Sequence, residues 1–411
     1  MASSEPAAYA ETAAPPAVDS TADRVRPHAR LIALLALGHF TVDVNQGALP
    51  AILPFLKSAH QLSYGAAATI VLAANVTSSI IQPLFGYLAD RTARRWMLPV
   101  AVLLSGLGVA ATGVAPGYPA LLALIVVMGL GIAAYHPEGY KAATAVAGDR
   151  KATALSWFAV GGNIGIALGP PLITVLVAGL GLPGSLGLLV PTVLVAALLL
   201  AALPRLDRAV APPKAAAAAL DAVNRPAALA VLIVVVMIRS WSSLGFTTFV
   251  PFYYVDHLQA DPRLVGTLLF VFLGAGALGT LVAGPIADRW GTRRFILWAF
   301  LATPPVALVF LGVRGLLAFV LLALVGALLT STFTLSVLLG QTYLPKNAGM
   351  ASGLVIGFAI GAGGLGVTLL GWIADHHGLL WALWLSALMP LAGFVAALFL
   401  PASPAGPART P

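Results

Sequence analysis

The sequence predicts an all-α membrane protein with twelve transmembrane helices arranged as two six-helix repeats. Of its 411 residues, 60% are hydrophobic and 9% are charged, and the mean hydropathy is +0.96. A chain this apolar belongs in a bilayer, because a water-soluble core could not hide so much surface. A repeat supports the same fold: the segment Gly86 to Arg95 returns 198 residues later as Gly284 to Arg294. Each copy joins two long apolar runs, which indicates a duplicated bundle.

The distribution of charge predicts the orientation of the chain. The net charge is +8, and 18 of the 22 Lys and Arg fall on one side of the proposed membrane. Only Lys57, Arg263 and Arg314 fall in loops of the other side. Because Lys and Arg gather in cytoplasmic loops, both termini and both copies of the repeated loop are expected in the cytoplasm. The positive net charge therefore reflects the orientation of the chain in the membrane, and we expect no nucleic-acid partner.

Five segments are expected along the chain. They are a disordered cytoplasmic arm (1–30), an N-terminal six-helix bundle (31–203), a cytoplasmic linker (204–226), a C-terminal six-helix bundle (227–401) and a cytoplasmic tail (402–411). The arm begins with 23 residues that hold acids but no base in an Ala, Pro and Ser background, which is unlike a signal peptide. The linker combines Pro212-Pro213 with an alanine run and basic residues, as flexible connections do.

Several kinds of chemistry are not expected. The chain has no cysteine, so disulfides and thiolate sites are excluded. It also lacks the glycine-rich loop that cradles the phosphates of ATP. His376 and His377 are adjacent, so on a helix they point apart and make a poor metal site. We expect no metal, no cofactor, no enzymatic activity and a monomer in the lipid bilayer.

Glycines recur at four-residue spacing in the fifth and eleventh apolar runs. The first set is Gly161, Gly165 and Gly169, and the second is Gly353, Gly357 and Gly361. Such strips let helix backbones approach closely in lipid. We interpret both strips as helix-packing surfaces.

Two ionisable residues, His39 and Asp43, lie near the middle of the first apolar run. An ionised side chain there costs about 2.5–3.5 kcal/mol on insertion scales, so few such groups are expected. At 1.5 Å per residue Asp43 lies roughly 18 Å along a helix that begins near Leu31, and the four-residue spacing puts His39 on the same face. We interpret Asp43 as a proton carrier and His39 as its relay or counter-charge. The alternative is a fixed hydrogen-bonded pair that holds this helix against a neighbour.

The fourth apolar run carries His136-Pro137-Glu138 in the cytoplasmic third of the bilayer, at the depth of His39. Pro137 removes a backbone donor and should kink the helix. His136 shares a face with Tyr140, whereas Glu138 points away from them. His136 and Glu138 are candidates for proton coupling. The alternative for Glu138 is that it reaches cytoplasmic water and pairs with Lys141.

Arg239 is the basic residue expected deep in the second half, about 12 residues into the seventh run. A permanent guanidinium at the midplane binds an anionic or polar substrate group or neutralises a carboxylate such as Asp43. The alternative is a static partner for Asp43 or for helix carbonyls. The other candidate substrate contacts are polar or aromatic residues within the spans, for which interhelical contact or core packing is the alternative: Asn75, Tyr140, Asn163, Trp157 and Trp241.

The repeated loop, Gly86-x-x-x-Asp90-Arg91-x-x-x-Arg95, resembles the signature of the major facilitator superfamily between its second and third helices. The run Gly165-x-x-x-Gly169-Pro170 resembles the first part of an antiporter motif, although Ile173 and Thr174 replace its closing glycines. Two further segments resemble the fosmidomycin-resistance family of bacterial exporters: Gly38-His39-Phe40-x-x-Asp43-x-x-x-Gly47-Ala48-Leu49-Pro50 and Gly129-x-Gly131-x-x-x-Tyr135-His136-Pro137-Glu138-Gly139.

The resemblance implies a gate at the repeated loop. In the superfamily the loop aspartate helps to lock the inner side by meeting basic groups and a helix N-terminus, here that of the eleventh run near Ala348. The gating residues implied in this way come from the two copies of the loop: Asp90, Arg91, Arg94 and Arg95, with Asp288 and Arg289 as a weaker second copy. The alternative, in which the basic loop residues only anchor the orientation of the chain, explains the arginines but not the repeated aspartate.

The resemblance implies a proton-coupled drug exporter of the bacterial inner membrane, an antiporter that moves fosmidomycin-like or other small antibiotics by alternating access. One alternative is a proton-coupled importer of a small organic anion or sugar. A second alternative is a membrane receptor or scaffold that transports nothing.

Overall fold

The computed structural model describes residues 28–91, 94–147, 151–208 and 223–401, and these residues form helices and short connections without a β-strand. The all-helical prediction is therefore confirmed for the described chain. The twelve α-helices are α1 (Ala29–His60), α2 (Tyr64–Arg91), α3 (Met97–Ala110), α4 (Tyr118–Val146), α5 (Lys151–Leu180), α6 (Leu189–Arg208), α7 (Pro226–Phe252), α8 (Leu264–Trp290), α9 (Thr292–Gly312), α10 (Leu316–Tyr343), α11 (Ala348–His377) and α12 (Leu379–Leu398). The expected arm, up to residue 27, and the tail, from residue 402, lie outside the described residues.

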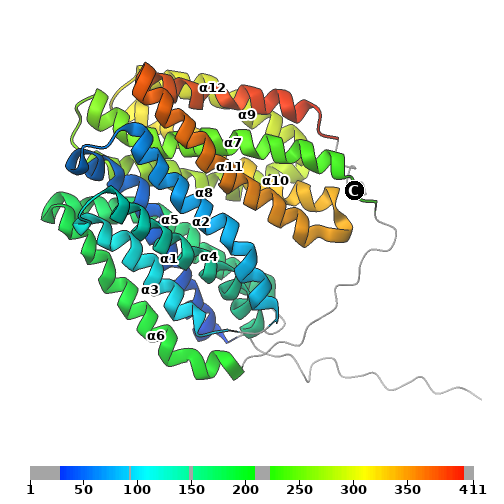
Figure 1. Ribbon diagram of the computed structural model, residues 1–411. Coiled ribbons are helices and arrows are strands. Elements are labelled where there is room, and N and C mark those ends of the chain that lie inside the picture. Colours follow the sequence, from blue (N-terminus) through cyan, green and yellow to red (C-terminus); the bar gives the residue numbers. More distant parts are fainter. Residues whose placement is uncertain (1–27, 92–93, 148–150, 209–222, 402–411) are drawn as a thin grey trace, which may run out of the picture.

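Helices α1–α6 gather on one side of the molecule and α7–α12 on the other (Figure 1). The two halves meet chiefly where α2 packs against α11 and where α5 packs against α8. Because the helices run up and down, α6 ends and α7 begins at the same end of the molecule, which we call the linker end. The opposite end, where α1 ends and α2 begins, is called the loop end.

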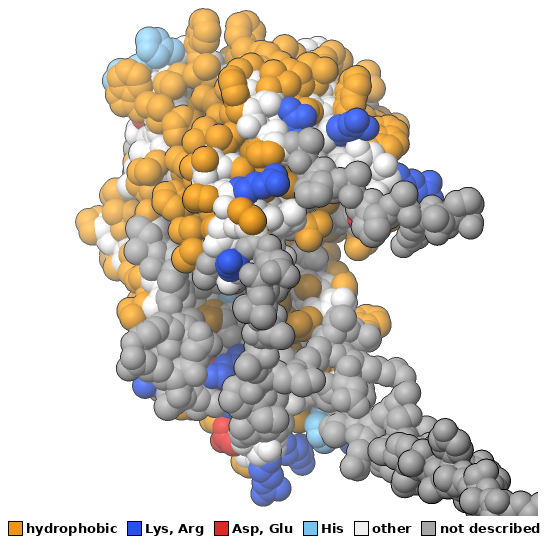
Figure 2. Space-filling view, turned by 90° about the vertical axis from the view of Figure 1, so that its right-hand side faces the viewer, with side chains coloured by type: hydrophobic (Ala, Val, Ile, Leu, Met, Phe, Trp, Pro, Cys, Tyr) orange, Lys and Arg blue, Asp and Glu red, His pale blue; other side chains and the backbone are white. Residues whose placement is uncertain are grey.

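Ten of the described helical segments are long and apolar enough to cross a membrane. The two others are α1 and α2, which have 32 and 28 residues. Helix α1 is less apolar because it carries His39, Asp43 and Asn45 in its middle, and all three are buried. Figure 2 looks onto the linker end and shows Lys and Arg side chains among a broad hydrophobic surface. The chain is therefore a multi-pass membrane protein, and the polar groups in the middle of α1 face the protein interior.

Helix α6 continues through Pro204, where the linker was expected to begin, and ends at Arg208. Proline removes only one backbone hydrogen bond, and Leu206 beyond it is 1% exposed, so burial holds the last turn in place. Helix α7 begins at Pro226, a position where the missing N–H of proline costs nothing. Between them, residues 209–222 of the linker lie outside the described chain.

The glycine strip of α5 packs directly on the backbone of α1. A Cβ atom at Gly161 would lie 2.3 Å from the carbonyl oxygen of Ala36, and one at Gly165 would lie 2.3 Å from that of Phe40. Real Cβ atoms do not approach an oxygen so closely, so only glycine allows this contact. The packing interpretation of the α5 strip is therefore confirmed.

The strip in α11 is different. A Cβ at Gly353, Gly357 or Gly361 would meet no described atom within 4 Å, so the packing interpretation is wrong for this strip as far as the described residues go. Further along the same helix, toward the loop end, a Cβ at Gly371 would lie 2.7 Å from Ala68 of α2. Helices α2 and α11 therefore touch in their loop-end halves, whereas α11 presents an uncovered glycine strip in its linker-end half.

Four polar residues join the two halves at the loop end, and we call them the loop-end latch: Lys57, Tyr64, Asp256 and Asp375. The Asp375 carboxylate of α11 accepts the backbone N–H groups of Tyr64 and Gly65 at 2.7 and 2.8 Å, at the start of α2. Asp256, after α7, accepts the Tyr64 hydroxyl at 2.9 Å and pairs with Lys57 at 3.1 Å. An acid that caps a helix N-terminus gains from both hydrogen bonds and the helix dipole. The latch holds the loop end closed.

The Asp375→Asn substitution should loosen the latch, because it removes the charge that the N-terminus of α2 binds. Hydrogen bonds to a charged group contribute about 1.5–3 kcal/mol, so opening at the loop end should become roughly tenfold or more frequent. The chain has no cysteine, so a Val71→Cys reporter, buried between the halves, is its single thiol. Its rate of alkylation by a membrane-impermeant maleimide should rise about tenfold. Asp261→Asn, an exposed loop-end aspartate, is the matched control, and an equal rise in both variants would contradict the latch.

Candidate functional site

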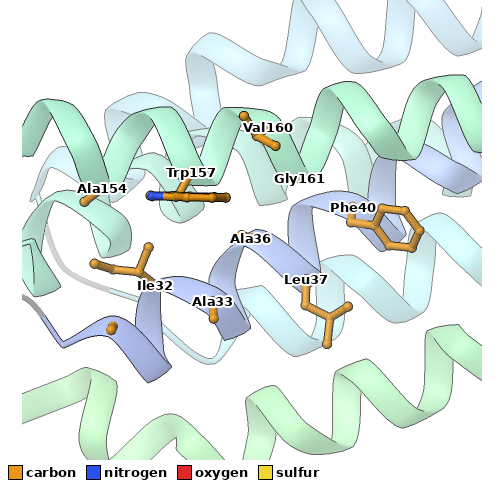
Figure 3. Close-up of a pocket in the computed structure, with 10 residues that line it drawn as sticks. Ile32, Ala33, Ala36, Leu37, Phe40, Ala154, Trp157, Val160 and Gly161 are labelled. Carbon is orange, nitrogen blue, oxygen red and sulfur yellow. The ribbon is translucent and has the colours of Figure 1, made fainter. Parts of the chain in front are cut away.

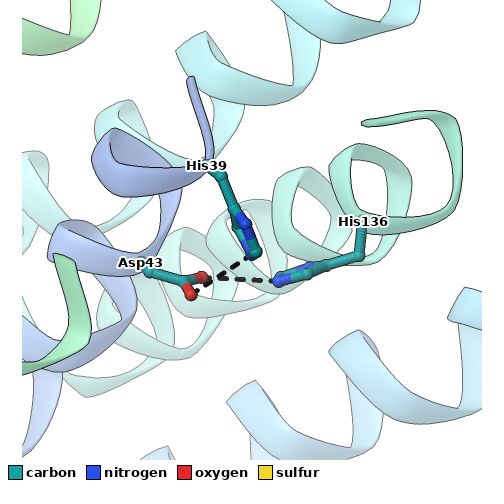
Figure 4. Close-up of side chains that lie close together, drawn as sticks. All are labelled: His39, Asp43 and His136. Carbon is teal, nitrogen blue, oxygen red and sulfur yellow. Dashed lines mark ion pairs between the residues drawn. The ribbon is translucent and has the colours of Figure 1, made fainter. Parts of the chain in front are cut away.

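Three side chains from α1 and α4 meet inside the N-terminal half: His39, Asp43 and His136 (Figure 4). The Nε2 atom of His39 lies 3.4 Å from Oδ2 of Asp43, and the Nε2 atom of His136 lies 3.4 Å from Oδ1. Asp43 is 8% exposed, and its Oδ1 atom has no hydrogen-bond partner. The structure thus brings together the pair expected on α1 and a histidine from a helix some 90 residues away in the chain. We call these three residues the His–Asp–His cluster.

Backbone carbonyls determine the tautomer of both histidines. The Nδ1 atom of His39 lies 2.8 Å from the carbonyl oxygen of Phe158, and the Nδ1 atom of His136 lies 2.9 Å from that of Ile132. Because a carbonyl oxygen only accepts, each Nδ1 must carry the hydrogen. A neutral ring then turns the lone pair of Nε2 toward the carboxylate, and this contact is favourable only when a proton lies between them. The cluster therefore places one acid and two bases around a position that a proton can occupy.

Helix α5 closes the cluster from one side. A Cβ on Gly162 would lie 2.6 Å from both Oδ2 of Asp43 and Nε2 of His39, and the Phe158 ring stacks on His39 with 4.3 Å between ring centroids. Tyr140 lies beside the same two rings and is 43% exposed. The three candidate ligand atoms lie within 4.8 Å of one another.

Glu138 does not join the cluster. Its Oε1 atom accepts a hydrogen bond from Nη1 of Arg95 at 2.7 Å, and the two side chains are 0% and 3% exposed. Glu138 is therefore enclosed in protein and bound to Arg95, so it does not reach water as the alternative expected, although the charge of Lys141 also acts on it. Helix α4 runs unbroken through Pro137, so His136 and Glu138 leave the same helix on different faces. The ion pair ties the loop before α3 to the helix that positions His136.

Arg239 lies on α7 and faces α10. Its Nε atom donates to the carbonyl oxygen of Leu329 at 2.9 Å, and its guanidinium stacks over the Phe333 ring at 5.0 Å from the centroid. No ion pair joins Arg239 to Asp43 or to another acid among the described residues. The second half therefore holds a positive charge whose remaining donors can receive an anion.

The other candidate contacts fall in different surroundings. Asn75 is 9% exposed on α2 and lines a cavity between the halves. Trp241 packs on Gly366 of α11 with its indole N–H buried and unpartnered, which is a packing position. Asn163 is exposed on α5. Trp157 is 64% exposed and lines an apolar groove of about 590 Å³ between α1 and α5 (Figure 3). Asn75 thus reaches a cavity between the halves.

The expected gating residues are only partly described. The side chains of Asp90 and Arg91 lie outside the described residues. Arg95 is buried with Glu138, so it acts through α4 and not as an exposed loop charge. Asp288 and Arg289 are exposed at the end of α8.

Several contacts of the candidate site have no signal in the sequence. Phe158 supplies a backbone carbonyl, which any residue has, so no residue type marked it. Asp375, next to His376 at the end of α11, caps α2 from the other half of the molecule. A cap between segments 311 residues apart leaves no local sequence pattern.

The family model of the Major Facilitator Superfamily matches residues 35–355 and 232–411. The chain belongs to this superfamily. This transporter is 31% identical over 378 residues to the fosmidomycin resistance protein of Escherichia coli, covering 90% of this chain and 92% of the relative. It is also 31% identical over 378 residues to the uncharacterized MFS-type transporter YfnC of Bacillus subtilis, covering 89% and 91%. The resemblance to the fosmidomycin-resistance family is confirmed.

Solved structures agree with the fold. The transporter is similar to a mutant of the nucleoside transporter NupG, with a TM-score of 0.72, 12% identity and coverage of 90% of this chain and 99% of that one. It is also similar to a bacterial homologue of the iron transporter ferroportin in an inward-facing state, with a TM-score of 0.71, 16% identity and coverage of 91% and 99%. At these identities the likeness concerns the fold alone.

In this transporter the Arg95→Met substitution should lower the free energy of unfolding by about 3 kcal/mol or more, because it leaves the Glu138 carboxylate buried without its partner. The thermal unfolding midpoint in detergent should fall accordingly. The double variant Arg95→Met/Glu138→Leu removes both charges and should recover most of the loss. Equal midpoints for the single and the double variant would contradict a coupled buried pair.

Proposed function

We propose that this transporter exports small anionic antibiotics from the cytoplasm in exchange for protons. The His–Asp–His cluster carries the proposal, since it is a buried proton site whose two bases face one carboxylate at 3.4 Å. The name of the Escherichia coli relative supports fosmidomycin, a phosphonate, as a first substrate to test.

The orientation forms part of the proposal. With twelve spanning helices both termini and the linker lie on one side, and the excess of Lys and Arg at the linker end supports a cytoplasmic position for that side in a bacterium. The conformation described is then inward-facing: the loop-end latch is closed, and the glycine strip of α11 lies uncovered at the cytoplasmic end. Asp90 at the end of α2 would close that end on the start of α11, as Asp375 at the end of α11 closes the other end on α2.

Arg239 is the proposed contact for the anionic group of the substrate. None of the described acids pairs with it, and its Nε atom donates one hydrogen bond to a carbonyl oxygen. Its remaining N–H groups can therefore bind an anion. The cluster lies in the other half of the molecule. A substrate anion and a proton thus bind to different halves, which rock against each other during transport.

The cycle follows from these two sites. Drug enters from the cytoplasm and meets Arg239, and the linker end closes as the latch opens. Drug leaves outward, and a proton enters the His–Asp–His cluster. The protonated cluster carries no net negative charge, so the empty carrier returns and releases the proton inward. Exchange requires that the unloaded, unprotonated carrier does not return freely.

Transport in everted membrane vesicles tests the coupling. An acidic vesicle interior should drive radiolabelled fosmidomycin inward, and Asp43→Asn should abolish this accumulation, because the neutral amide removes the acid that the two histidines face. Exchange of labelled for unlabelled drug without a gradient should persist in the variant. Asp207→Asn, on the last turn of α6, is the control and should behave like the wild type.

The result also separates the alternatives. Accumulation that ignores the proton gradient in the wild type would refute coupling. Accumulation driven by an acidic exterior would indicate import. Binding without flux in proteoliposomes would indicate a receptor.

Substituting Arg239 by Gln should weaken the binding of fosmidomycin roughly 10- to 100-fold, because a hydrogen bond to a charged group contributes about 1.5–3 kcal/mol. Calorimetric titration of purified protein in lipid nanodiscs measures the affinity. Arg314→Gln, near the start of α10 at the loop end, preserves the net charge of the variant and should bind normally. Unchanged affinity in Arg239→Gln would exclude Arg239 as the anion contact.

A further inference from the structure

A groove on the C-terminal half combines two basic residues with apolar walls. Its volume is about 980 Å³, and residues of α8 and α9 line it together with Leu328 of α10. Helix α9 packs against α8, α10 and α12, all from the same half, and no described residue of α1–α6 lines the groove. The groove is therefore separate from the cavity between the halves and faces the surrounding bilayer. We call it the outer groove.

Two arginines form the linker end of the outer groove: Arg289, near the end of α8, and Arg294, near the start of α9. Both are exposed, and neither makes a hydrogen bond or an ion pair with another described residue. Asp288 adjoins Arg289 in the chain but does not line the groove. Two guanidinium groups without a counter-charge attract an anion, and each can donate two parallel hydrogen bonds to a phosphate.

Two tryptophans lie beside these arginines. Trp290 follows Arg289, and Trp298 lies one helical turn beyond Arg294 on α9. Their side chains are 58% and 62% exposed. Tryptophan gathers at the membrane–water interface, where its ring contacts the chains and its N–H meets polar groups. The arginines are therefore expected at the depth of the phospholipid headgroups on the linker-end side.

Beyond the arginines, the wall of the outer groove is apolar as far as the middle of the membrane. Ala302 lies eight residues after Arg294 on α9, which is about 12 Å deeper. Leu328 lies 12 residues after the loop-end start of α10, which is about 18 Å from that end. One leaflet contributes about 15 Å to a hydrocarbon core of about 30 Å. The groove thus extends over the depth of one leaflet, from the headgroups to the bilayer centre.

We propose that the outer groove binds one anionic phospholipid from the leaflet on the linker-end side. Its phosphate pairs with Arg289 and Arg294, and an acyl chain lies along Trp298 and Ala302. The positive charge selects an anionic headgroup, and the apolar wall favours a lipid over a small soluble anion, which would leave that wall uncovered. Lipid binding at this site needs neither drug nor proton, so it stands apart from the proposed export.

Native mass spectrometry of the purified transporter in detergent tests the headgroup contact. Phosphatidylglycerol and phosphatidylcholine with the same chains are titrated separately, and one molecule of phosphatidylglycerol should bind more tightly than phosphatidylcholine. Arg289→Gln/Arg294→Gln should weaken phosphatidylglycerol binding roughly 20- to 30-fold, because each basic residue near an anionic lipid contributes about fivefold. Its binding of phosphatidylcholine should not change. Arg289→Lys/Arg294→Lys keeps the charge and should retain most of the affinity.

Arg205→Gln/Arg208→Gln is the matched control. These two arginines are exposed in the last turn of α6, at the same end of the molecule but outside the groove. The control loses the same charge and should bind phosphatidylglycerol like the wild type. Equal weakening in the two glutamine variants would mean that only the net charge of the linker end matters, and it would overturn the proposed site. Equal affinity of the wild type for both lipids would also overturn it.

A second comparison tests the acyl-chain contact. Ala302→Phe fills the apolar part of the groove and should weaken phosphatidylglycerol binding severalfold. Leu301→Phe is its control, since Leu301 is 41% exposed on the same helix but does not line the groove. Glycerol 3-phosphate, which carries the phosphate without the chains, should not displace the lipid. Its displacement of the lipid, or unchanged affinity in Ala302→Phe, would reduce the groove to a phosphate site and overturn the proposal.

Discussion

The buried carboxylate of Asp43 is the constraint on which the N-terminal half depends. A charge at this depth in a membrane helix is tolerated only with partners, and each partner here is itself oriented by a second contact. The glycine strip of α5 lets that helix lie directly on α1, and this contact brings the Phe158 carbonyl to His39. Helix α4 supplies His136 and is tied to the loop before α3 through Glu138. Helix packing, hydrogen bonding and the placement of the Asp43 carboxylate thus depend on one another.

The two halves are chemically unequal although they share a fold. The N-terminal half holds an acid between two bases, and the C-terminal half holds an arginine without a described acidic partner. In the proposed cycle, the duplicated bundle supplies the symmetry that lets the halves rock, and the difference in charge separates the proton site from the anion site. In that cycle, helices α2 and α11 couple proton binding to anion binding. Asp375 joins the two helices at the loop end, while no described residue covers the glycine strip of α11 at the linker end.

Some of the site could be predicted from the sequence because it depends on spacing within one helix. His39 and Asp43 are four residues apart, and helical geometry alone places them on one face. The partnership of Arg95 with Glu138 could not be predicted, because it joins residues 43 positions apart whose distance depends on how α3 packs against α4. The two glycine strips have the same pattern, yet only that of α5 is covered, because coverage depends on the conformation of the whole molecule.

The sequence by itself determined that the chain lies in a membrane, that its bundle is duplicated and which few ionisable groups are placed in its interior. Composition and local periodicity suffice for these, since the bilayer penalises each exposed polar group independently of the others. Only the tertiary structure decided which polar groups meet. It paired His136 with Asp43, left Arg239 without a partner among the described acids, capped α2 with Asp375 and placed Asn75 beside a cavity between the halves. These are distances between helices, and side-chain packing over the whole bundle determines them.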